Sequence, residues 1–225
     1  FSRGRSSDRL VPALRDVSFT VPKGTVLGVI GRNGAGKSTL LRTIAGILAP
    51  DSGRVTVRGR ISALLSVGVV FSETMNGREN NKLGGLAIGL SEARLAELTE
   101  AIGEFAQLGE YLDFPVRTYS SGMRARLGFA VAAHLDPEVL LIDEALTGGD
   151  VKFKEQTADK MYELCGGGRT IVIVSHGLSA IRAMAGTALW LHQGRVVELG
   201  DPDDVVARYM RYCRIEASSL EFDDE

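Results

Sequence analysis

The feature that most constrains the fold of this chain is a glycine-rich stretch over residues 31–39, Gly31-Arg32-Asn33-Gly34-Ala35-Gly36-Lys37-Ser38-Thr39. It follows the pattern G-x-x-x-x-G-K-[ST] of a phosphate-binding loop, with one further Thr. The apolar run 26–30 leads into it as a buried strand, and residues 40–45 follow as a helix. In this context glycines let backbone N–H groups curl around phosphate oxygens, and the helix N-terminus adds partial positive charge. The sequence therefore predicts a nucleotide-phosphate site.

The chemistry of that site follows from two positions in the loop and from a second motif. Lys37 is expected to reach the β- and γ-phosphates, and the Ser38 hydroxyl to hold Mg²⁺. The apolar strand 139–142 ends in Asp143-Glu144, at the sheet edge where ligands bind in doubly wound folds. Asp143 is expected in the Mg²⁺ shell, and Glu144 is expected to deprotonate an attacking water. Without the loop at 31–39, the same pair would read equally well as an ordinary charged turn.

The composition suits one globular domain and excludes several classes of protein. The 225 residues are 44% apolar with a net charge of −2, so no basic field indicates nucleic acid or an anionic membrane surface. The two cysteines, Cys165 and Cys213, form no CxxC pair, which favours a reduced, cytoplasmic setting. No run approaches the roughly 18 apolar residues that a membrane span needs.

The patterns along the chain predict an α/β fold with a mostly parallel core sheet, antiparallel β elements and a helical subdomain. One domain over 1–225 is expected, with a core at 1–71 and 136–225 and a helical subdomain at 72–135. In that subdomain Ser91-Glu92 opens a helix whose apolar face carries Leu95, Leu98, Ile102 and Phe105. Expected strands cover 17–21, 25–30, 54–58, 139–143 and 170–174, with a hairpin at 189–199 turning at Gln193-Gly194 and helices over 151–164 and 203–214.

Two further features point toward the same sheet edge. Tyr119-Ser120-Ser121-Gly122-Met123 opens a helix, where serines act as caps. The same geometry also offers free N–H groups to an anion, and both interpretations stay open. His176 follows the strand 170–174, so it could reach the edge where Asp143 lies. His134 is expected on a helix face, and His192 in the hairpin.

These motifs, in this order and spacing, resemble the nucleotide-binding subunit of an ABC transporter, over nearly the whole chain. The resemblance implies a P-loop NTPase fold and an ATPase that uses ATP and Mg²⁺. It implies that Ser120, Ser121 and Gly122 belong to the signature motif, that Asp150 is the D-loop aspartate and that His176 is the switch histidine. It also implies a head-to-tail dimer closed by ATP, with each nucleotide between one chain's loop and the other chain's signature motif.

Several stretches resemble more closely the ATPases that export lipid-linked glycans such as O-antigen, wall teichoic acid and galactan. They are residues 13–19, 46–53, 77–80 and 115–123. The resemblance implies a separate membrane-spanning subunit as partner, a lipid-linked polysaccharide handled by the complex, no nucleic acid, and a place on the cytoplasmic face of the membrane. Ser72 stands where the family has a glutamine that touches Mg²⁺ and the membrane partner. Val11-Pro12 stands where many members have an aromatic residue against adenine.

Two alternatives stay open at this point. One is an ABC-type ATPase acting on nucleic acid or ribosomes, although such proteins usually fuse two cassettes or insert a long coiled coil. The other is a non-catalytic nucleotide-binding regulator, against which Glu144 and His176 argue. For the leading interpretation, the polar, glycine-bearing segment 72–80 is expected to be the surface that docks the membrane subunit, with Glu73 and Arg78 as its charges.

Overall fold

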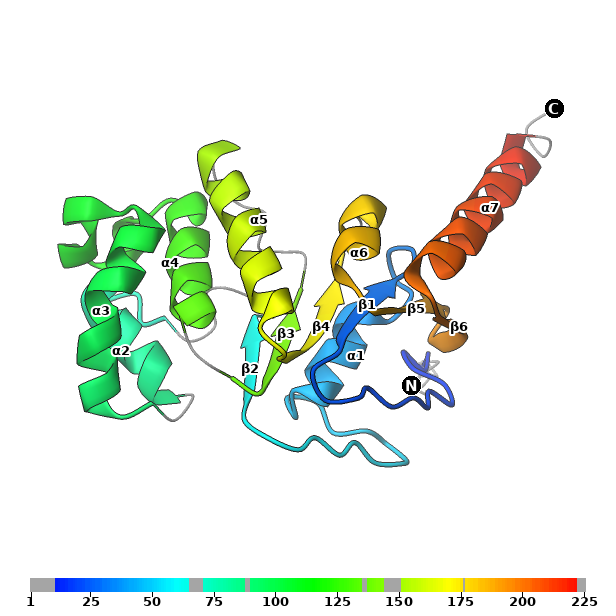
Figure 1. Cartoon of the computed structure of the whole chain (residues 1–225), viewed down its shortest axis with the longest axis horizontal. Coiled ribbons are helices and arrows are strands. Elements are labelled where there is room, and N and C mark those ends of the chain that lie inside the picture. Colours follow the sequence, from blue (N-terminus) through cyan, green and yellow to red (C-terminus); the bar gives the residue numbers. More distant parts are fainter. Residues whose placement is uncertain are drawn as a thin grey trace, which may run out of the picture.

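The computed structural model describes residues 11–64, 71–87, 90–134, 137–143, 151–175 and 177–221. These residues form a six-stranded sheet in the order β2-β3-β4-β1-β5-β6 (Figure 1). The strands are β1 (Val26–Ile30), β2 (Ile61–Leu64), β3 (Val139–Ile142), β4 (Thr170–Val174), β5 (Thr187–His192) and β6 (Arg195–Gly200). All neighbours pair in parallel except β5 and β6, which form the predicted antiparallel hairpin.

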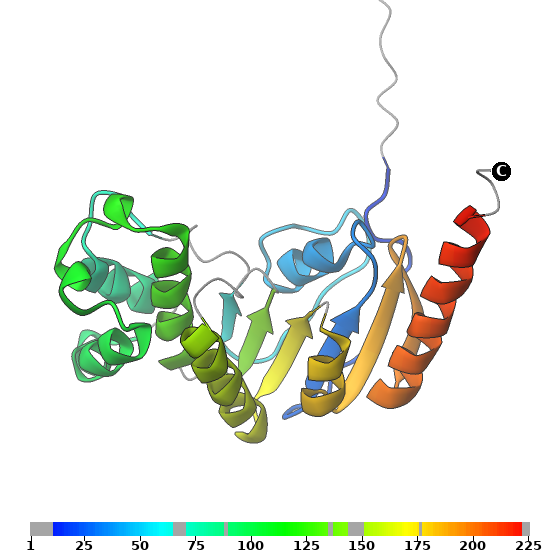
Figure 2. The ribbon, with the colours of Figure 1, turned by 90° about the horizontal axis from the view of Figure 1, so that it is seen from above.

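Helices cover both faces of the sheet, which explains why its central strands are apolar throughout. Helix α1 (Lys37–Ile44) lies on one face, and α5 (Val151–Gly166) and α6 (Leu178–Met184) lie on the other (Figures 1 and 2). Alternate strand residues serve the two cores. Leu27 and Val29 pack with Leu40 and Leu41 of α1, whereas Val26 and Ile30 belong to the core on the α5 and α6 side.

The last helix, α7 (Pro202–Glu221), extends the predicted closing helix by several residues. Its buried residues Val205 and Val206 join the α5 and α6 core, and its aromatic residues Tyr209 and Tyr212 lie against Trp190 of β5. Figure 1 shows α7 reaching away from the sheet toward the C-terminus. The helix therefore connects the edge of the sheet with the end of the described chain.

A separate group of helices lies beyond the β2 edge of the sheet (Figure 2). It comprises α2 (Gly77–Ala87), α3 (Glu92–Ala106), α4 (Ser121–His134) and two short 3₁₀ turns at Gly109–Asp113 and Val116–Thr118. The helix predicted from Ser91-Glu92 is confirmed, since the Ser91 hydroxyl accepts the Arg94 N–H at 3.3 Å. Its apolar face is also confirmed: Leu95 and Ile102 are buried, and Leu98 and Phe105 pack against the core.

Two predicted strands are wrong. Residues 17–21 and 54–58 are assigned to no strand. The side chains of Val17, Phe19 and Val21 do pack on the α1-side core, as does Val57, so their alternation reflects one-sided packing rather than a hydrogen-bonded ladder. Val55 is 46% exposed, which leaves the 54–58 segment little apolar contact to fix a register. Of the apolar run 61–70, residues 65–70 lie outside the described residues.

Candidate nucleotide site

The phosphate loop joins β1 to α1 in a shape that depends on glycine at two positions. Gly31 and Gly36 have φ angles of 152° and 103°. A Cβ at Gly31 would collide with the Leu191 carbonyl, and one at Gly36 would lie 2.6 Å from the Ala13 carbonyl. Helix α1 then begins at once, with the Leu40 N–H donating to the Gly36 carbonyl at 2.8 Å. The loop is therefore pressed against neighbouring backbone, and its free N–H groups lie at a helix N-terminus.

Lys37 occupies the centre of this loop. Its side chain is only 7% exposed, and its ammonium donates to the carbonyls of Gly31 at 2.6 Å and Arg32 at 3.0 Å. A buried cation needs such partners, because its desolvation would otherwise be costly. The same ammonium can exchange backbone oxygens for phosphate oxygens, so the loop holds a positive charge where an anion would bind.

A hollow of about 270 Å³ opens beside the loop and brings the two predicted motifs together. Its lining comprises Ala13, Asn33, Gly34, Gly36, Lys37, Ser38, Thr39, Asp143 and Val174. The Asp143 carboxylate at the end of β3 thus shares one space with the Ser38 and Thr39 hydroxyls at the start of α1. The juxtaposition joins residues that are more than one hundred positions apart in the sequence.

The donor set of this hollow fits a magnesium ion bound with a nucleotide. Hydroxyl and carboxylate oxygens are the protein ligands that Mg²⁺ takes, usually one or two together with phosphate oxygens and water. Elsewhere in the described ranges, no three His, Cys, Asp or Glu side chains gather as a metal-binding group. Ser38 and Asp143 would hold the ion, which would neutralise charge on the phosphates.

The loop is supported by two segments that were not predicted to be part of the site. The Gly194 N–H of the β5–β6 turn donates to the Ala35 carbonyl at 2.9 Å, and the Arg15 N–H donates to the Gly194 carbonyl at 2.7 Å. Ala13 reaches the hollow from this N-terminal segment, and Val174 reaches it from the end of β4. Val174 could have been predicted to line the site, because it lies at the carboxyl end of a parallel strand. No local feature of the sequence marks Ala13 as part of the site.

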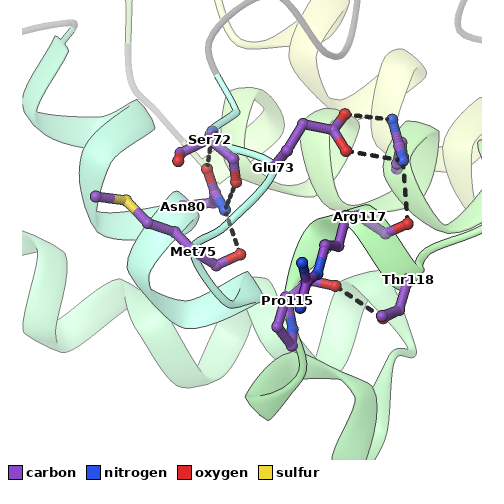
Figure 3. A network of polar contacts seen from close by, with 8 residues as sticks. Ser72, Glu73, Met75, Asn80, Pro115, Arg117 and Thr118 are labelled. Atoms are coloured by element: carbon purple, nitrogen blue, oxygen red, sulfur yellow. Dashed lines mark hydrogen bonds and ion pairs between the residues drawn. The ribbon is translucent and has the colours of Figure 1, made fainter.

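The other predicted site residues have different places. Ser72 lies in the helical group, where its N–H donates to the Asn80 side chain at 2.7 Å (Figure 3). Ser120 caps α4, with its hydroxyl accepting the Met123 N–H at 3.2 Å, so the capping interpretation is confirmed. Ser121 and Gly122 form the first turn of α4. Glu144, Asp150 and His176 lie outside the described residues.

The sheet order, the glycine loop and the hollow with Asp143 define a P-loop nucleotide-binding domain. Residues 14–147 match the family model of the ABC transporter. The chain belongs to the ABC transporter family.

Two curated proteins of this family are similar to the chain over most of its length. The chain is 44% identical, over 98% of its length, to an O-antigen export system ATP-binding protein of Myxococcus xanthus. It is also 44% identical, over 90% of its length, to a teichoic acids export ATP-binding protein of Bacillus cereus. The chain spans 51% of the first relative and 37% of the second, so it corresponds to about half of their length or less.

A solved structure of the ATP-binding subunit of an ABC transporter resembles the fold closely. The TM-score is 0.78 at 27% identity, covering 88% of this chain and 87% of that one. Among the described residues, no helix combines the length and apolar character needed to traverse a bilayer.

Proposed function

We propose that this chain binds ATP with Mg²⁺ and hydrolyses it to power export of a lipid-linked polysaccharide through a separate membrane subunit. The observation that carries the proposal is the hollow shared by Lys37, Ser38 and Asp143. The two relatives reported above are ATP-binding proteins of O-antigen and teichoic acid export systems, which supports the proposed transport role. On this proposal the chain works at the cytoplasmic face of the membrane and handles no nucleic acid.

The proposed roles divide between binding and chemistry. Lys37 and the loop N–H groups of residues 31–39 hold the phosphates, and Ser38 and Asp143 hold the magnesium ion. Glu144 follows Asp143 directly, so we assign it the role of the general base that takes the proton of the attacking water. We assign His176 as the second catalytic residue. Ser72 stays a proposed metal contact, although it lies beside Asn80 in the helical group.

A second copy of the chain would complete the site. The loop lies between β1 and α1, whereas Ser120, Ser121 and Gly122 lie at the start of α4 in the helical group (Figures 1 and 2). We propose that these residues and Asp150 contact the nucleotide of the partner chain. The proposed division into a core at 1–71 and 136–225 and a helical subdomain at 72–135 gives each copy one of each part.

The membrane subunit is proposed to dock at segment 72–80, but both charged side chains predicted for that surface, Glu73 and Arg78, are paired within the helical group. Glu73 pairs with Arg124 at 2.7 Å, and Arg78 pairs with Asp113 at 2.9 Å and Glu100 at 3.1 Å. Charge reversal at Glu73 or Arg78 would therefore damage the helical group itself, and would not isolate a docking defect.

Exposed apolar residues beside this segment are better candidates for the docking surface. Met75 is 39% exposed, Tyr111 57% and Phe114 52%. Met75 and Phe114 come from segments that run side by side, since the Val116 N–H donates to the Met75 carbonyl at 2.9 Å. Tyr111 and Phe114 have ring centroids 6.1 Å apart. Exposed aromatic and methionine side chains are enriched at protein interfaces, so this apolar patch fits a cytoplasmic segment of the membrane subunit.

The decisive experiment measures phosphate release from Mg²⁺-ATP by the wild-type chain and by Lys37→Ala and Glu144→Gln. Lys37→Ala is expected to lose nucleotide binding. Glu144→Gln is expected to keep binding and lose about 10²-fold or more in turnover, the scale of removing a positioned base. Lys82→Ala is the control, because that lysine is exposed and pairs with Glu92 in the helical group.

Three outcomes would contradict parts of the proposal. Near-normal turnover by Glu144→Gln would remove this residue from the role of base. Nucleotide binding without turnover by the wild-type chain would favour a non-catalytic regulator. Turnover stimulated by nucleic acid rather than by membranes that contain the partner would favour the nucleic-acid ATPase.

A further inference from the structure

The side chain of Arg32 leaves the phosphate loop and pairs with the C-terminal helix. Its guanidinium donates to the Glu216 carboxylate at 2.5 Å, across 184 positions of sequence. The two side chains are 54% and 34% exposed. Although Arg32 lies between Gly31 and Asn33, it is not among the residues that line the hollow. This cation of the loop is therefore directed away from the place where the phosphates would bind.

Glu216 is also held by Tyr212 of the same helix, which packs on the end of β5. The Tyr212 hydroxyl donates to its second carboxylate oxygen. The Tyr212 ring in turn packs on Trp190 and His192, with centroids 5.3 and 5.2 Å apart. The Tyr212 hydroxyl, and after it the Arg32 guanidinium, hold the pKa of Glu216 below its ordinary value. The carboxylate is thus anchored on α7 independently of the arginine that it receives.

Both ends of the pair rest on neighbouring strands. Trp190 of β5 is the register partner of Ile30, the last residue of β1 before the loop. Arg32 is also fixed through its backbone, because its carbonyl accepts the Lys37 ammonium at 3.0 Å and the Ala35 N–H at 3.1 Å. When phosphate draws the Lys37 ammonium away, the Glu216 contact remains to hold residue 32.

From this geometry we infer that Glu216 is a positioning residue that keeps the Arg32 guanidinium off the bound nucleotide and so weakens nucleotide retention. The inference rests on the nucleotide binding proposed above. Released from Glu216, the guanidinium would be drawn to the phosphate oxygens, with which it forms strong charge-assisted hydrogen bonds. The Gly194 N–H, which donates to the Ala35 carbonyl at 2.9 Å, supports the loop without Glu216.

The test uses Glu216→Gln, because the amide oxygen still accepts the Tyr212 hydroxyl while the charge is lost. Equilibrium binding of ADP and ATP is measured on the chain at low and high salt. The Kd is expected to fall about twofold to fivefold at low salt, the scale of an exposed ion pair, and the gain should shrink at high salt. The KM for ATP should fall likewise, without a rise in kcat. In an Arg32→Ala background, the same Glu216→Gln change should no longer alter the Kd.

The matched control is Glu198→Gln, which breaks another ion pair of α7, Arg208 with Glu198 at 2.7 Å, and removes the same charge. Its Kd should equal that of the wild type. Unchanged or weaker nucleotide binding by Glu216→Gln would overturn the inference. An equal gain with and without Arg32 would overturn it too, because Glu216 would then act through Tyr212 or through its charge alone. A wild-type chain that binds no nucleotide would instead reject the proposed function, and the inference with it.

Discussion

The carboxylate of Glu73 accepts hydrogen bonds from both terminal nitrogens of Arg124, at 2.7 and 3.4 Å (Figure 3). The pair joins the segment before α2 to the first turn of α4. Beside it, the Arg117 N–H donates to the Glu73 carbonyl at 3.0 Å. Glu73 of the proposed docking segment therefore contacts Arg117 and Arg124, which lie within four residues of Ser120 in the proposed signature motif. A displacement of segment 72–76 would be transmitted to the start of α4.

The pairing of Glu73 with Arg124 predicts that reversing one charge destabilises the chain and that reversing both restores its stability. Glu73→Arg should destabilise the chain by about 1 kcal/mol, because two cations would then face each other at a two-pronged contact that is partly exposed. The double variant Glu73→Arg with Arg124→Glu should recover most of that loss. Urea unfolding measures both, with Arg94→Glu as the control at an exposed pair within α3. Equal stability of the single and double variants would show that the two side chains do not interact.

Asn80 is predicted to be the most sensitive polar residue of the helical group. It is completely buried, and its amide donates to the carbonyls of Ser72, Met75 and Asn76 at 3.0 to 3.1 Å (Figure 3). Asn80→Ala should cost about 3 kcal/mol, because several buried backbone groups lose their partner at once. Lys82→Ala on the same helix should change stability by less than about 0.5 kcal/mol. A melting temperature of Asn80→Ala within a degree of the wild type would contradict this assignment.

The stability of the chain should depend on Tyr209 at alkaline pH. Burial, and then a hydrogen bond with Cys213, raise the pKa of Tyr209 to about 12. Because the folded pKa lies above the ordinary value of about 10, the folded state retains the proton that the unfolded chain loses. Stability from this group is full below about pH 10 and is lost as the pH rises toward about 12. Tyr209→Phe should therefore lose less stability than the wild type between these values, measured by urea unfolding. Tyr162→Phe, at an exposed residue of α5, should follow the wild-type curve.

The phosphate loop and the strand before Asp143 could be predicted because each is specified locally. Glycine spacing fixes the turn at 31–39, and a continuous apolar run indicates a strand buried on both faces. Asn80 could not be predicted, since its partners are backbone groups and its polar neighbourhood is also typical of an exposed segment. The pair of Arg32 and Glu216 had no local signal across 184 positions. The predicted strands at 17–21 and 54–58 were wrong for a different reason. Their apolar and polar residues alternate as in a strand, but the segments do not pair with a neighbouring strand of the described sheet.

ATP is predicted to drive the chain into a dimer, because Ser120, Ser121 and Gly122 lie in the helical group rather than at the hollow. Glu144→Gln, which should retain ATP, is expected to elute as a dimer with Mg²⁺-ATP and as a monomer without it, by size-exclusion chromatography with light scattering. Adding Ser121→Glu should abolish the dimer, since a carboxylate there would repel the triphosphate. Ser52→Glu, in an exposed turn of the core, should leave it intact. A monomer at saturating ATP and high protein concentration would count against the proposed arrangement.

The apolar patch of Met75, Tyr111 and Phe114 predicts where the membrane subunit docks. Phe114→Ser and Met75→Ser remove exposed apolar side chains, 52% and 39% accessible, without touching the hollow or the internal ion pairs. If Phe114 is an anchor of the interface, its loss should weaken binding about tenfold or more, the scale of an interface residue with a dominant contribution. The measurement is paired: copurification of the variant with the coexpressed membrane subunit, and ADP binding by the isolated chain.

ADP binding should stay at the wild-type level, because these side chains lie in the helical group and the nucleotide hollow is formed by the core. Tyr162→Ser is the control, since it removes an aromatic residue of similar exposure, 51%, from α5. It should change neither copurification nor nucleotide binding. Undiminished copurification of both Phe114→Ser and Met75→Ser would place the docking surface elsewhere on the molecule. Equal losses for these variants and for Tyr162→Ser would show that general surface hydrophobicity, and not this patch, holds the complex together.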